Sequence, residues 1–311
     1  MTRSYLRKTG VSLFGRLRSC MTSDLHPARV AEWYREEPGD LQRATCDAVG
    51  EYIARRSVMV GLFDPGFEYP IRRGTGTCVS VGERRFVATA AHLFRDVPVP
   101  YRAALIPLTA APSRDLFLPT GQNHRGGGGS DPVDVAWLEL AEGTARDLGR
   151  DFLPLDGVEP HYSGMAGEPL FSYGFPETPA GPDGRPTFGD FPVQAYSTVV
   201  LDPATIDARF LPNAAIDIFA RYSTRVVEGP LPDGRVARLP GAQGLSGSAF
   251  WRIDAGKHGI WTLDDVKFVG IQHQWCPEAE WFRATKVCHW LRLVADDHPE
   301  LRPEIEAVLA R

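Results

Sequence analysis

Short apolar or alternating runs with turn residues between them fill most of this chain, and they limit its possible folds more than any other feature. A first series comprises SVMVGLF (57–63), GTGTCVSV (74–81), FVATAA (86–91), YRAALIPL (101–108) and VDVAWLEL (133–140). A second series comprises EPLFSYGF (168–175), PVQAYSTVV (192–200), AIDIFARYSTRVV (215–227), SAFWRI (248–253), VKFVGIQHQW (266–275) and WFRATKV (281–287). Runs at this spacing without alternating helices indicate antiparallel sandwiches or barrels, so the predicted fold class is mostly β.

Turn chemistry and composition divide the chain further. GER at 82–84 predicts a hairpin that joins the second and third runs. RGGGGSDP at 125–132 has the composition of a flexible surface loop. The segment 143–167 is rich in glycine, proline and acidic residues, and it separates the two series. It marks the predicted boundary between two β domains, 51–150 and 151–284.

Both ends of the chain carry helical patterns. Within 26–56, with Asp40 as the candidate N-cap, apolar residues recur at helical spacing: Leu41, Ala48, Val49, Tyr52 and Ile53. Near the other end, an i, i+3, i+4, i+7 pattern predicts one buried helix face: Val287, Trp290, Leu291 and Val294. Prolines at 299 and 303 then start a last helix. We therefore expect a basic arm with a helical extension (1–50) and C-terminal helices (285–311).

Composition narrows the function classes. The net charge is −5, so the 311-residue chain lacks the basic excess that favours nucleic acid or anionic membranes as partners. The sequence has no Walker loop, no H-E-x-x-H motif and no paired cysteine spacing for zinc. We therefore expect no cofactor and no metal.

Cysteine usage bears on the compartment. The five cysteines are widely spaced and include no C-x-x-C pair: Cys20, Cys46, Cys78, Cys276 and Cys288. The basic segment 1–20 also lacks the apolar run of a signal peptide. These features predict free, mostly buried thiols in a cytoplasmic protein. Residues 1–20 fit a disordered arm, an amphipathic targeting segment, or a stretch upstream of a true start at Met21.

The stretch GAQGLSGSAFW (241–251) places Ser246 between glycines and ahead of an apolar run. Glycine and serine cluster in turns for conformational reasons, so a plain turn is the simpler interpretation of this stretch alone. A serine hydroxyl becomes a good nucleophile only with a general base within hydrogen-bond reach and a group that orients the base. The rest of the chain must therefore supply both partners.

His92 and Asp134 are the candidates for those partners. His92 follows the apolar run 86–91, whereas the other histidines lie in polar, turn-like or helical contexts; a structural strand-end histidine is the alternative. Asp134 lies on the apolar face of VDVAWLEL, where a carboxylate is costly to bury without a partner. The alternatives are that Asp134 belongs to a turn begun by Asp131 and Pro132, or that Asp131 is the acid.

The three candidates occur in the order histidine, acid, serine, which neither α/β-hydrolases nor subtilisin-like enzymes share. TAAH (89–92), DVA (134–136) and GLSGS (244–248) resemble motifs of the trypsin-like, chymotrypsin-fold serine proteases in their bacterial form. GTGTCVSV, YGFP (173–176) and VGIQHQW (269–275) are similar to flanking strands of that family. The resemblance extends over roughly residues 55–290.

The resemblance implies two six-stranded antiparallel β-barrels with the site in the cleft between them. His92 and Asp134 then come from the first barrel and Ser246 from the second. His92 takes the proton of Ser246, and Asp134 holds the imidazole. By the same resemblance, the backbone N–H groups of Gly244 and Ser246 are expected to form the oxyanion hole.

The chain departs from the family at the expected substrate pocket. Pro240 stands six residues before Ser246, where trypsin itself has an acid that selects basic residues. We therefore expect no preference for cleavage after Lys or Arg. By the same resemblance the strand VGIQHQW lines the pocket, which makes Gln272 and His273 further pocket candidates.

Two functions from different classes follow. The first is a serine endopeptidase that acts on a protein or peptide substrate through an acyl-enzyme intermediate; an esterase with the same triad is a minor variant. The second is a non-catalytic or latent scaffold that binds a protein partner, because fold alone does not establish activity. Residues 1–50 fit a packed brace, a pro-segment or a docking surface for a regulatory protein, and base rates for amphipathic helices favour the brace.

Overall fold

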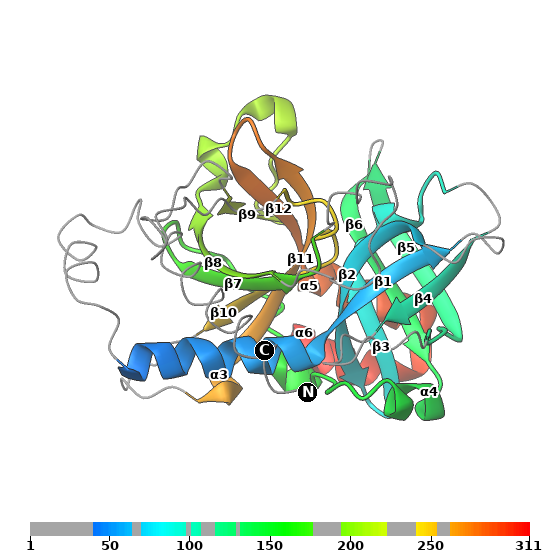
Figure 1. The fold of residues 1–311 in the computed structure, drawn as a ribbon. Helices are drawn as coiled ribbons and strands as arrows, with labels where there is room; N and C mark the ends of the chain where they lie inside the picture. The colour runs from blue at the N-terminus through cyan, green and yellow to red at the C-terminus, as the bar shows by residue number, and fades with distance from the viewer. Residues whose placement is uncertain are drawn as a thin grey trace, which may run out of the picture.

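The computed structural model describes residues 40–63, 70–97, 101–106, 116–128, 131–176, 194–222, 241–253 and 262–311. Two antiparallel β units lie side by side in it (Figure 1). The first contains β1 (Ser57–Phe63), β2 (Pro70–Val81), β3 (Arg84–Thr89), β4 (Arg102–Ile106), β5 (Gly121–Gly128) and β6 (Asp131–Leu140). The second contains β7 (Pro169–Gly174), β8 (Gln194–Leu201), β9 (Asp217–Arg221), β10 (Ala249–Ile253), β11 (Val266–Cys276) and β12 (Trp281–Lys286).

Only the second unit is the closed barrel that the resemblance implies, with the strand order β10-β11-β12-β9-β8-β7. The first is a six-stranded sheet in the order β4-β1-β2-β3-β6-β5, and within the described residues its two edge strands, β4 and β5, are not paired with each other. The prediction of two closed barrels is therefore wrong for the first unit. The outer edge of β4 is instead covered by Phe117, which exchanges two backbone hydrogen bonds with Leu105. These bonds satisfy the N–H and C=O groups of Leu105 on the edge of β4, which a neighbouring strand would pair in a closed barrel.

The glycine-rich stretch predicted to be a surface loop is partly a strand. β5 pairs with β6, so residues 125–128 belong to the sheet, and Asp131 is the first residue of β6. The register shifts between Gly126 and Gly128, and the φ angles of Gly126 and Gly127 are 68° and 93°. Glycine adopts such angles without strain, so the run marks a bulge in a strand whose ladder partner fixes it. The loop prediction is wrong for these four residues.

The predicted hairpin at 82–84 is confirmed. β2 and β3 pair antiparallel as far as Val81 and Arg84, and Gly82 between them has a φ of 55°. This hairpin leads directly into the segment that carries His92. The segment 143–167 leads from β6 through α4 (Glu142–Asp147) towards β7. A domain division within it remains a prediction.

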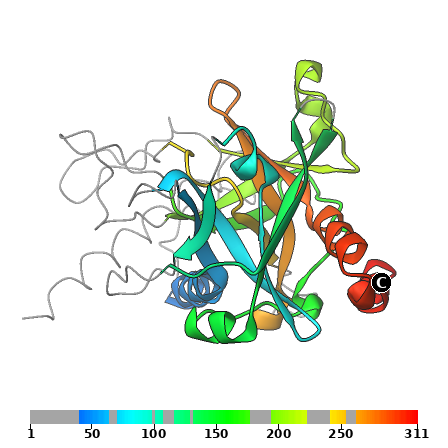
Figure 2. The same cartoon turned by 90° about the vertical axis from the view of Figure 1, so that its right-hand side faces the viewer.

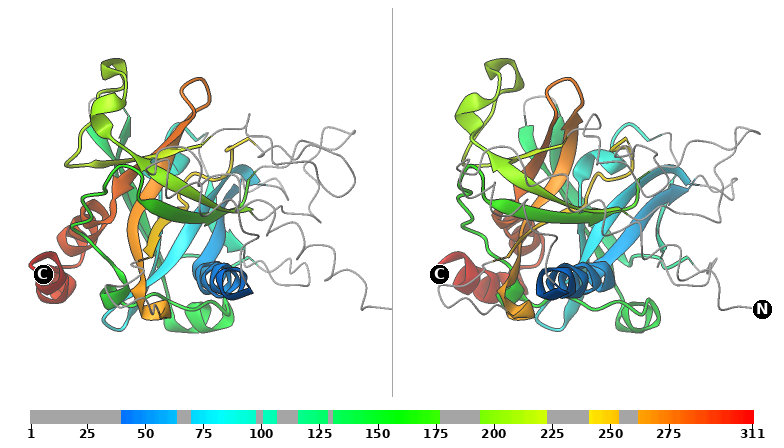
Figure 3. Two further views of the ribbon diagram at one scale, coloured as in Figure 1. Left: turned by 90° about the vertical axis from the view of Figure 1, so that its left-hand side faces the viewer. Right: turned by 60° about the vertical axis from the view of Figure 1, so that its left-hand side comes forward.

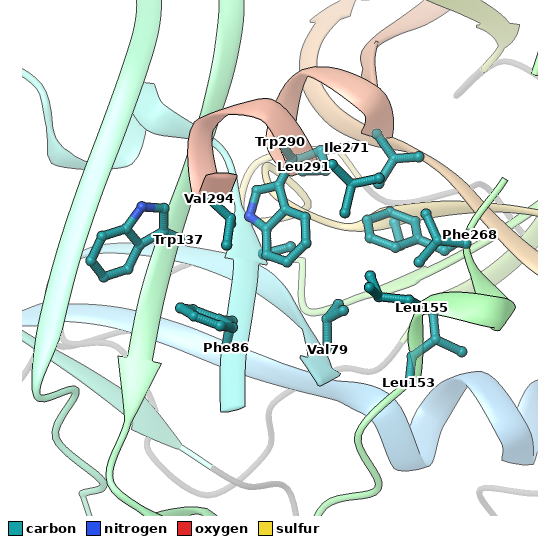
Figure 4. Packing of buried hydrophobic residues seen from close by; sticks show 14 of the residues in the cluster. Val79, Phe86, Trp137, Leu153, Leu155, Phe268, Ile271, Trp290, Leu291 and Val294 are labelled. Atoms are coloured by element: carbon teal, nitrogen blue, oxygen red, sulfur yellow. The ribbon is translucent and has the colours of Figure 1, made fainter. Parts of the chain in front are cut away.

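A shared hydrophobic core joins the two units. One cluster of buried side chains includes Val79 and Phe86 from the first unit, Phe268 from the second and Trp290 from the C-terminal helix (Figure 4). Further clusters fill each unit separately. The strands that carry the candidate site residues therefore rest on one packed body rather than on two loosely joined ones.

The C-terminal helices are as predicted. The expected apolar face of α5 (Val287–Asp297) is fully buried at Val287, Trp290, Leu291 and Val294. The indole N–H of Trp290 donates to the carbonyl oxygen of Ala136 at 3.0 Å, which attaches α5 to β6. α6 (Arg302–Leu309) follows and packs against α5 (Figure 2).

Helix α3 (Asp40–Arg56) is the described part of the helix predicted over 26–56. Val49 and Ile53 are buried in the shared core, and Tyr52 packs edge-on against Trp251 with ring centroids 6.2 Å apart. The helix contacts β2 of the first unit and β7 of the second (Figure 3). This part of the extension is therefore a brace, while residues 1–39 lie outside the described residues.

Three of the five cysteines are described with their side chains. Cys78, Cys276 and Cys288 are buried and form no disulfide, whereas the side chains of Cys20 and Cys46 lie outside the described part. Burial raises the pKa of the Cys78 thiol to about 12, so this thiol stays protonated and unreactive in the folded protein. No helix in the described ranges combines the length and apolar character needed to cross a bilayer.

We expect all five cysteines to be free in protein taken from a reducing compartment. Thiol titration of denatured, unreduced protein should count five, because the three described thiols are buried without a disulfide and a reducing compartment keeps thiols reduced. The native protein should react more slowly than the denatured one. A stable disulfide in cytosolic material would contradict the predicted compartment.

Candidate active site

The candidate nucleophile lies on a tightly hydrogen-bonded turn before β10. The N–H of Leu245 donates to Ala242 O at 3.0 Å, and that of Ser248 donates to Leu245 O at 2.9 Å. Gly244 and Gly247 adopt φ angles of 85° and 89°, which any side chain would strain. The glycines on either side of the serine are therefore required by the backbone conformation of the turn.

This turn is fixed to the first unit by backbone and side-chain contacts. The N–H of Thr75 on β2 donates to Ser246 O at 2.7 Å, and the Thr75 hydroxyl donates to Gly244 O at 3.1 Å. A Cβ on Gly247 would overlap the carbonyl oxygen of Thr75 and the hydroxyl of Thr89. The serine turn of the second unit therefore docks directly on the end of the strand that leads to His92.

Between residues 244 and 248, two backbone amides have no partner among the described residues. The N–H groups of Leu245, Gly247 and Ser248 are all hydrogen-bonded within the turn or to β11, whereas those of Gly244 and Ser246 are not. Two free donors flanking a serine are what an oxyanion hole requires. The carbonyl of Gly244 is held by Thr75, so the orientation of the adjoining peptide is fixed. The expected oxyanion role of Gly244 and Ser246 remains a prediction that this pattern supports.

His92 lies on the short 3₁₀ helix η2 (Ala91–Phe94), directly after β3. The guanidinium of Arg72 on β2 donates to three carbonyl oxygens at the end of this helix, those of His92, Leu93 and Arg95, at 2.8, 3.2 and 2.5 Å. These bonds satisfy carbonyls that a helix end leaves without partners. The backbone under the imidazole is therefore clamped by one arginine.

Asp134 contacts His92 through both carboxylate oxygens. Its Oδ1 accepts from the backbone N–H of His92 at 2.9 Å, and its Oδ2 lies 2.9 Å from His92 Nδ1. Because an ionised carboxylate only accepts, this contact places the His92 proton on Nδ1 and leaves Nε2 free to accept one. That is the orientation in which an imidazole can act as a general base.

Asp134 is buried, with 5% of its surface exposed. Burial by itself raises the pKa of this carboxyl, but the hydrogen bonds from His92 and the neighbouring imidazoles outweigh it, so the pKa is lowered overall. The carboxylate is therefore charged at neutral pH. A Cβ on Gly127 would come within 2.8 Å of Asp134 Oδ1 and would overlap the guanidinium of Arg95. The glycine bulge in β5 thus makes room for this buried charge.

The structure brings the three sequence-predicted residues to one junction. A Cβ on Gly74 would come within 2.7 Å of Ser246 O and would overlap Leu93, the neighbour of His92. The Ser246 hydroxyl and the His92 ring nonetheless make no hydrogen bond to each other within the described part of the chain. Such bonds are often long before substrate binds. The catalytic roles of His92, Asp134 and Ser246 remain predictions.

The predicted pocket residues fall in different places. Pro240 lies outside the described residues. Gln272 is 1% exposed, and its side-chain amide donates to Gln274 O at 3.2 Å. The imidazole of His273 lies against Asp134, with Nδ1 3.6 Å from Oδ2. A lining role for these residues stays a prediction.

Sequence reasoning did not identify the residues that support His92 and Asp134. Arg72 gave no signal because its partners are main-chain carbonyls, and Gly127 was hidden in a run of glycines typical of a loop. No group of His, Cys, Asp and Glu side chains that could hold a metal ion occurs among the described residues.

A scan against protein-family models finds no match, and no curated protein matches. Three of the solved structures found by comparison each align with this chain at a TM-score of 0.46. The protease Anisep from Arthrobacter nicotinovorans is 13% identical, over 75% of this chain and 90% of that one. The VesB protease of Vibrio cholerae is 16% identical, over 76% of this chain and 63% of that one. The inactivated protease paralogue S-I1 of the scabies mite is 16% identical, over 79% of this chain and 96% of that one.

Proposed function

We propose that this protein is a serine endopeptidase that cleaves peptide bonds through Ser246, His92 and Asp134. The observation that carries the proposal is that both carboxylate oxygens of Asp134 contact His92, one at its backbone N–H and one at Nδ1, which leaves Nε2 free to accept a proton. A buried carboxylate, an oriented imidazole and two unpaired amides next to a serine are the parts that acyl transfer needs.

The reaction follows from these parts. Ser246 Oγ attacks the substrate carbonyl carbon while His92 Nε2 takes its proton, and Asp134 stabilises the imidazolium that forms. The oxyanion accepts from the N–H groups of Gly244 and Ser246. His92 then gives the proton to the leaving amine, which departs as the acyl-enzyme forms. A water molecule, deprotonated by His92, attacks the ester and releases the acid, and the proton returns to Ser246.

One observation favours a second candidate, a latent or non-catalytic scaffold that binds a protein partner. Ser246 and His92 lie at one junction without a hydrogen bond between their side chains among the described residues. In a latent protease, binding of a partner or cleavage of the chain would bring the Ser246 hydroxyl and the His92 ring into hydrogen-bond contact. We also propose that the protein is cytoplasmic and that residues 1–50 bind a regulatory protein partner.

Fluorophosphonate labelling tests the proposed function. An active triad should label the folded protein on Ser246, because the probe reacts only with a serine that a base activates. The matched control is Ser248, two positions on, which is fully buried and accepts from the Ser172 hydroxyl at 3.3 Å. Ser248→Ala should still label, and Ser246→Ala should not. A folded protein that stays unlabelled supports the scaffold, and labelling without peptide cleavage supports an esterase.

A further inference from the structure

A second imidazole contacts the candidate catalytic acid. His273 on β11 comes from the second unit, and its Nδ1 lies 3.6 Å from Oδ2 of Asp134, the oxygen that also faces His92 Nδ1. The side chain of His273 is only 8% exposed. Its Nε2 is buried and has no hydrogen-bond partner among the described residues. Among the described residues, the carboxylate of Asp134 is the charged group that lies within 4 Å of His273 Nδ1.

A β-bulge directs this ring. In the pairing of β11 with β12, Gln272 lies opposite Ala284 and Gln274 lies opposite Arg283, so His273 is an extra residue with no partner across the ladder. A bulge changes the direction of the side chain it carries, and bulges are common beside active sites. Here it aims an imidazole from the second unit at an acid of the first.

His273 is uncharged at neutral pH. Burial lowers its pKa to about 4, although the nearby carboxylates of Asp134 and Asp217 oppose this. The other charged or titratable groups that face it are Arg283, which is paired with Asp217 at 2.7 Å, and His92. A neutral ring beside an ionised carboxylate is most stable with its proton on the nearer nitrogen, because a lone pair there would repel the charge. His273 thus presents an Nδ1–H group to Asp134.

We propose that His273 is a positioning residue that holds the Asp134 carboxylate in the plane that His92 requires. The inference rests on the proposed function and adds a fourth residue to it. The distance of 3.6 Å between His273 Nδ1 and Asp134 Oδ2 is just beyond that of a hydrogen bond. A small movement of the bulge would bring these two atoms within hydrogen-bond distance. His273 acts through Asp134 and does not touch the reacting atoms.

Three variants separate the role of Nδ1 from that of the whole ring. Asn carries its amide near the position of Nδ1, Gln extends to that of Nε2, and Leu has no donor. A hydrogen bond to a charged group contributes enough for His273→Leu and His273→Gln to lower kcat about 10- to 100-fold. KM should change little, because Asp134 does not contact substrate. His273→Asn should keep most of the activity. Equal kcat values for the Asn and Gln variants, or wild-type kcat for the Leu variant, would overturn the proposal.

His298 supplies a matched control. It is also a buried imidazole whose Nε2 has no partner among the described residues, but it lies between Phe86 and Trp137, where Arg84 is 2.9 Å from its Nδ1. His298→Leu should lower the melting temperature without a specific loss in kcat. If it lowers kcat as much as His273→Leu does, the effect of His273 is general destabilisation. If the Leu variants fail to fold, the Asn and Gln variants of His273 decide.

A spectroscopic test does not depend on activity. In Ser246→Ala protein with ¹⁵N-labelled histidine, His273 should give the signals of a neutral ring protonated on Nδ1 at neutral pH. A ring protonated on Nε2, or a charged ring, would overturn the proposal. If wild-type protein neither labels nor cleaves peptides, the proposed function fails, but the ¹⁵N spectrum still decides whether His273 donates to Asp134.

Discussion

Replacing Ser246 with alanine is expected to abolish peptide hydrolysis, with kcat reduced by at least about 10⁴-fold. The hydroxyl is the only group lost, and no other side chain in the turn can attack the substrate. The turn itself should survive, because its contacts to Thr75 run through the backbone oxygens of Gly244 and Ser246. The melting temperature should therefore stay close to that of the wild type.

His92→Ala should reduce kcat by a similar amount, and the double variant should be little worse than either single one. The residues act as one unit, because without the serine the histidine has no proton to take. Kinetics on one peptide substrate, with thermal melts for each variant, are sufficient to check this. Additive losses would show that Ser246 and His92 act independently. Unchanged turnover in all variants would show that Ser246 is not a nucleophile but only a residue of the turn.

Most strands could be predicted because each is a short apolar or alternating run that is visible in the local sequence. SVMVGLF became β1 (Ser57–Phe63) with the same bounds, since a β-branched run buried on both faces has few other options. β5 was missed because its glycines carry no strand preference of their own, and the ladder with β6 imposes the conformation. Closure of the first unit was overestimated because the pairing of edge strands depends on tertiary contacts such as that of Phe117 with Leu105.

The site shows the same division between local and tertiary information. His92 and Asp134 could be found because each is a polar residue in an apolar context, and burial of such groups calls for a partner. The direction of His273 could not be found, because the bulge beside Gln272 adds one residue and changes which way the side chain points. The contacts of Arg72 are with carbonyls 20 to 23 residues away, and no side-chain pattern reveals them.

Asp134→Asn is the prediction that most directly tests the assignment of the acid. The amide can donate to His92 Nδ1 where the carboxylate could only accept, which favours the tautomer with its proton on Nε2. That tautomer cannot take the proton of Ser246. In trypsin-like proteases the same exchange of acid for amide reduces turnover about 10⁴-fold, and we expect a loss of that order. The size of the residue hardly changes, so the protein should still fold.

The matched control is Asp131→Asn, three residues earlier on β6. Asp134 already occupies both groups of His92 that face it, the backbone N–H and Nδ1, so no place remains for a second carboxylate. Asp131→Asn should therefore be almost silent in kcat/KM. Both variants should be compared on one substrate, with thermal melts to show that each is folded. An inactive Asp131→Asn beside an active Asp134→Asn would mean that the acid is Asp131, and that the buried pair of Asp134 and His92 is only structural.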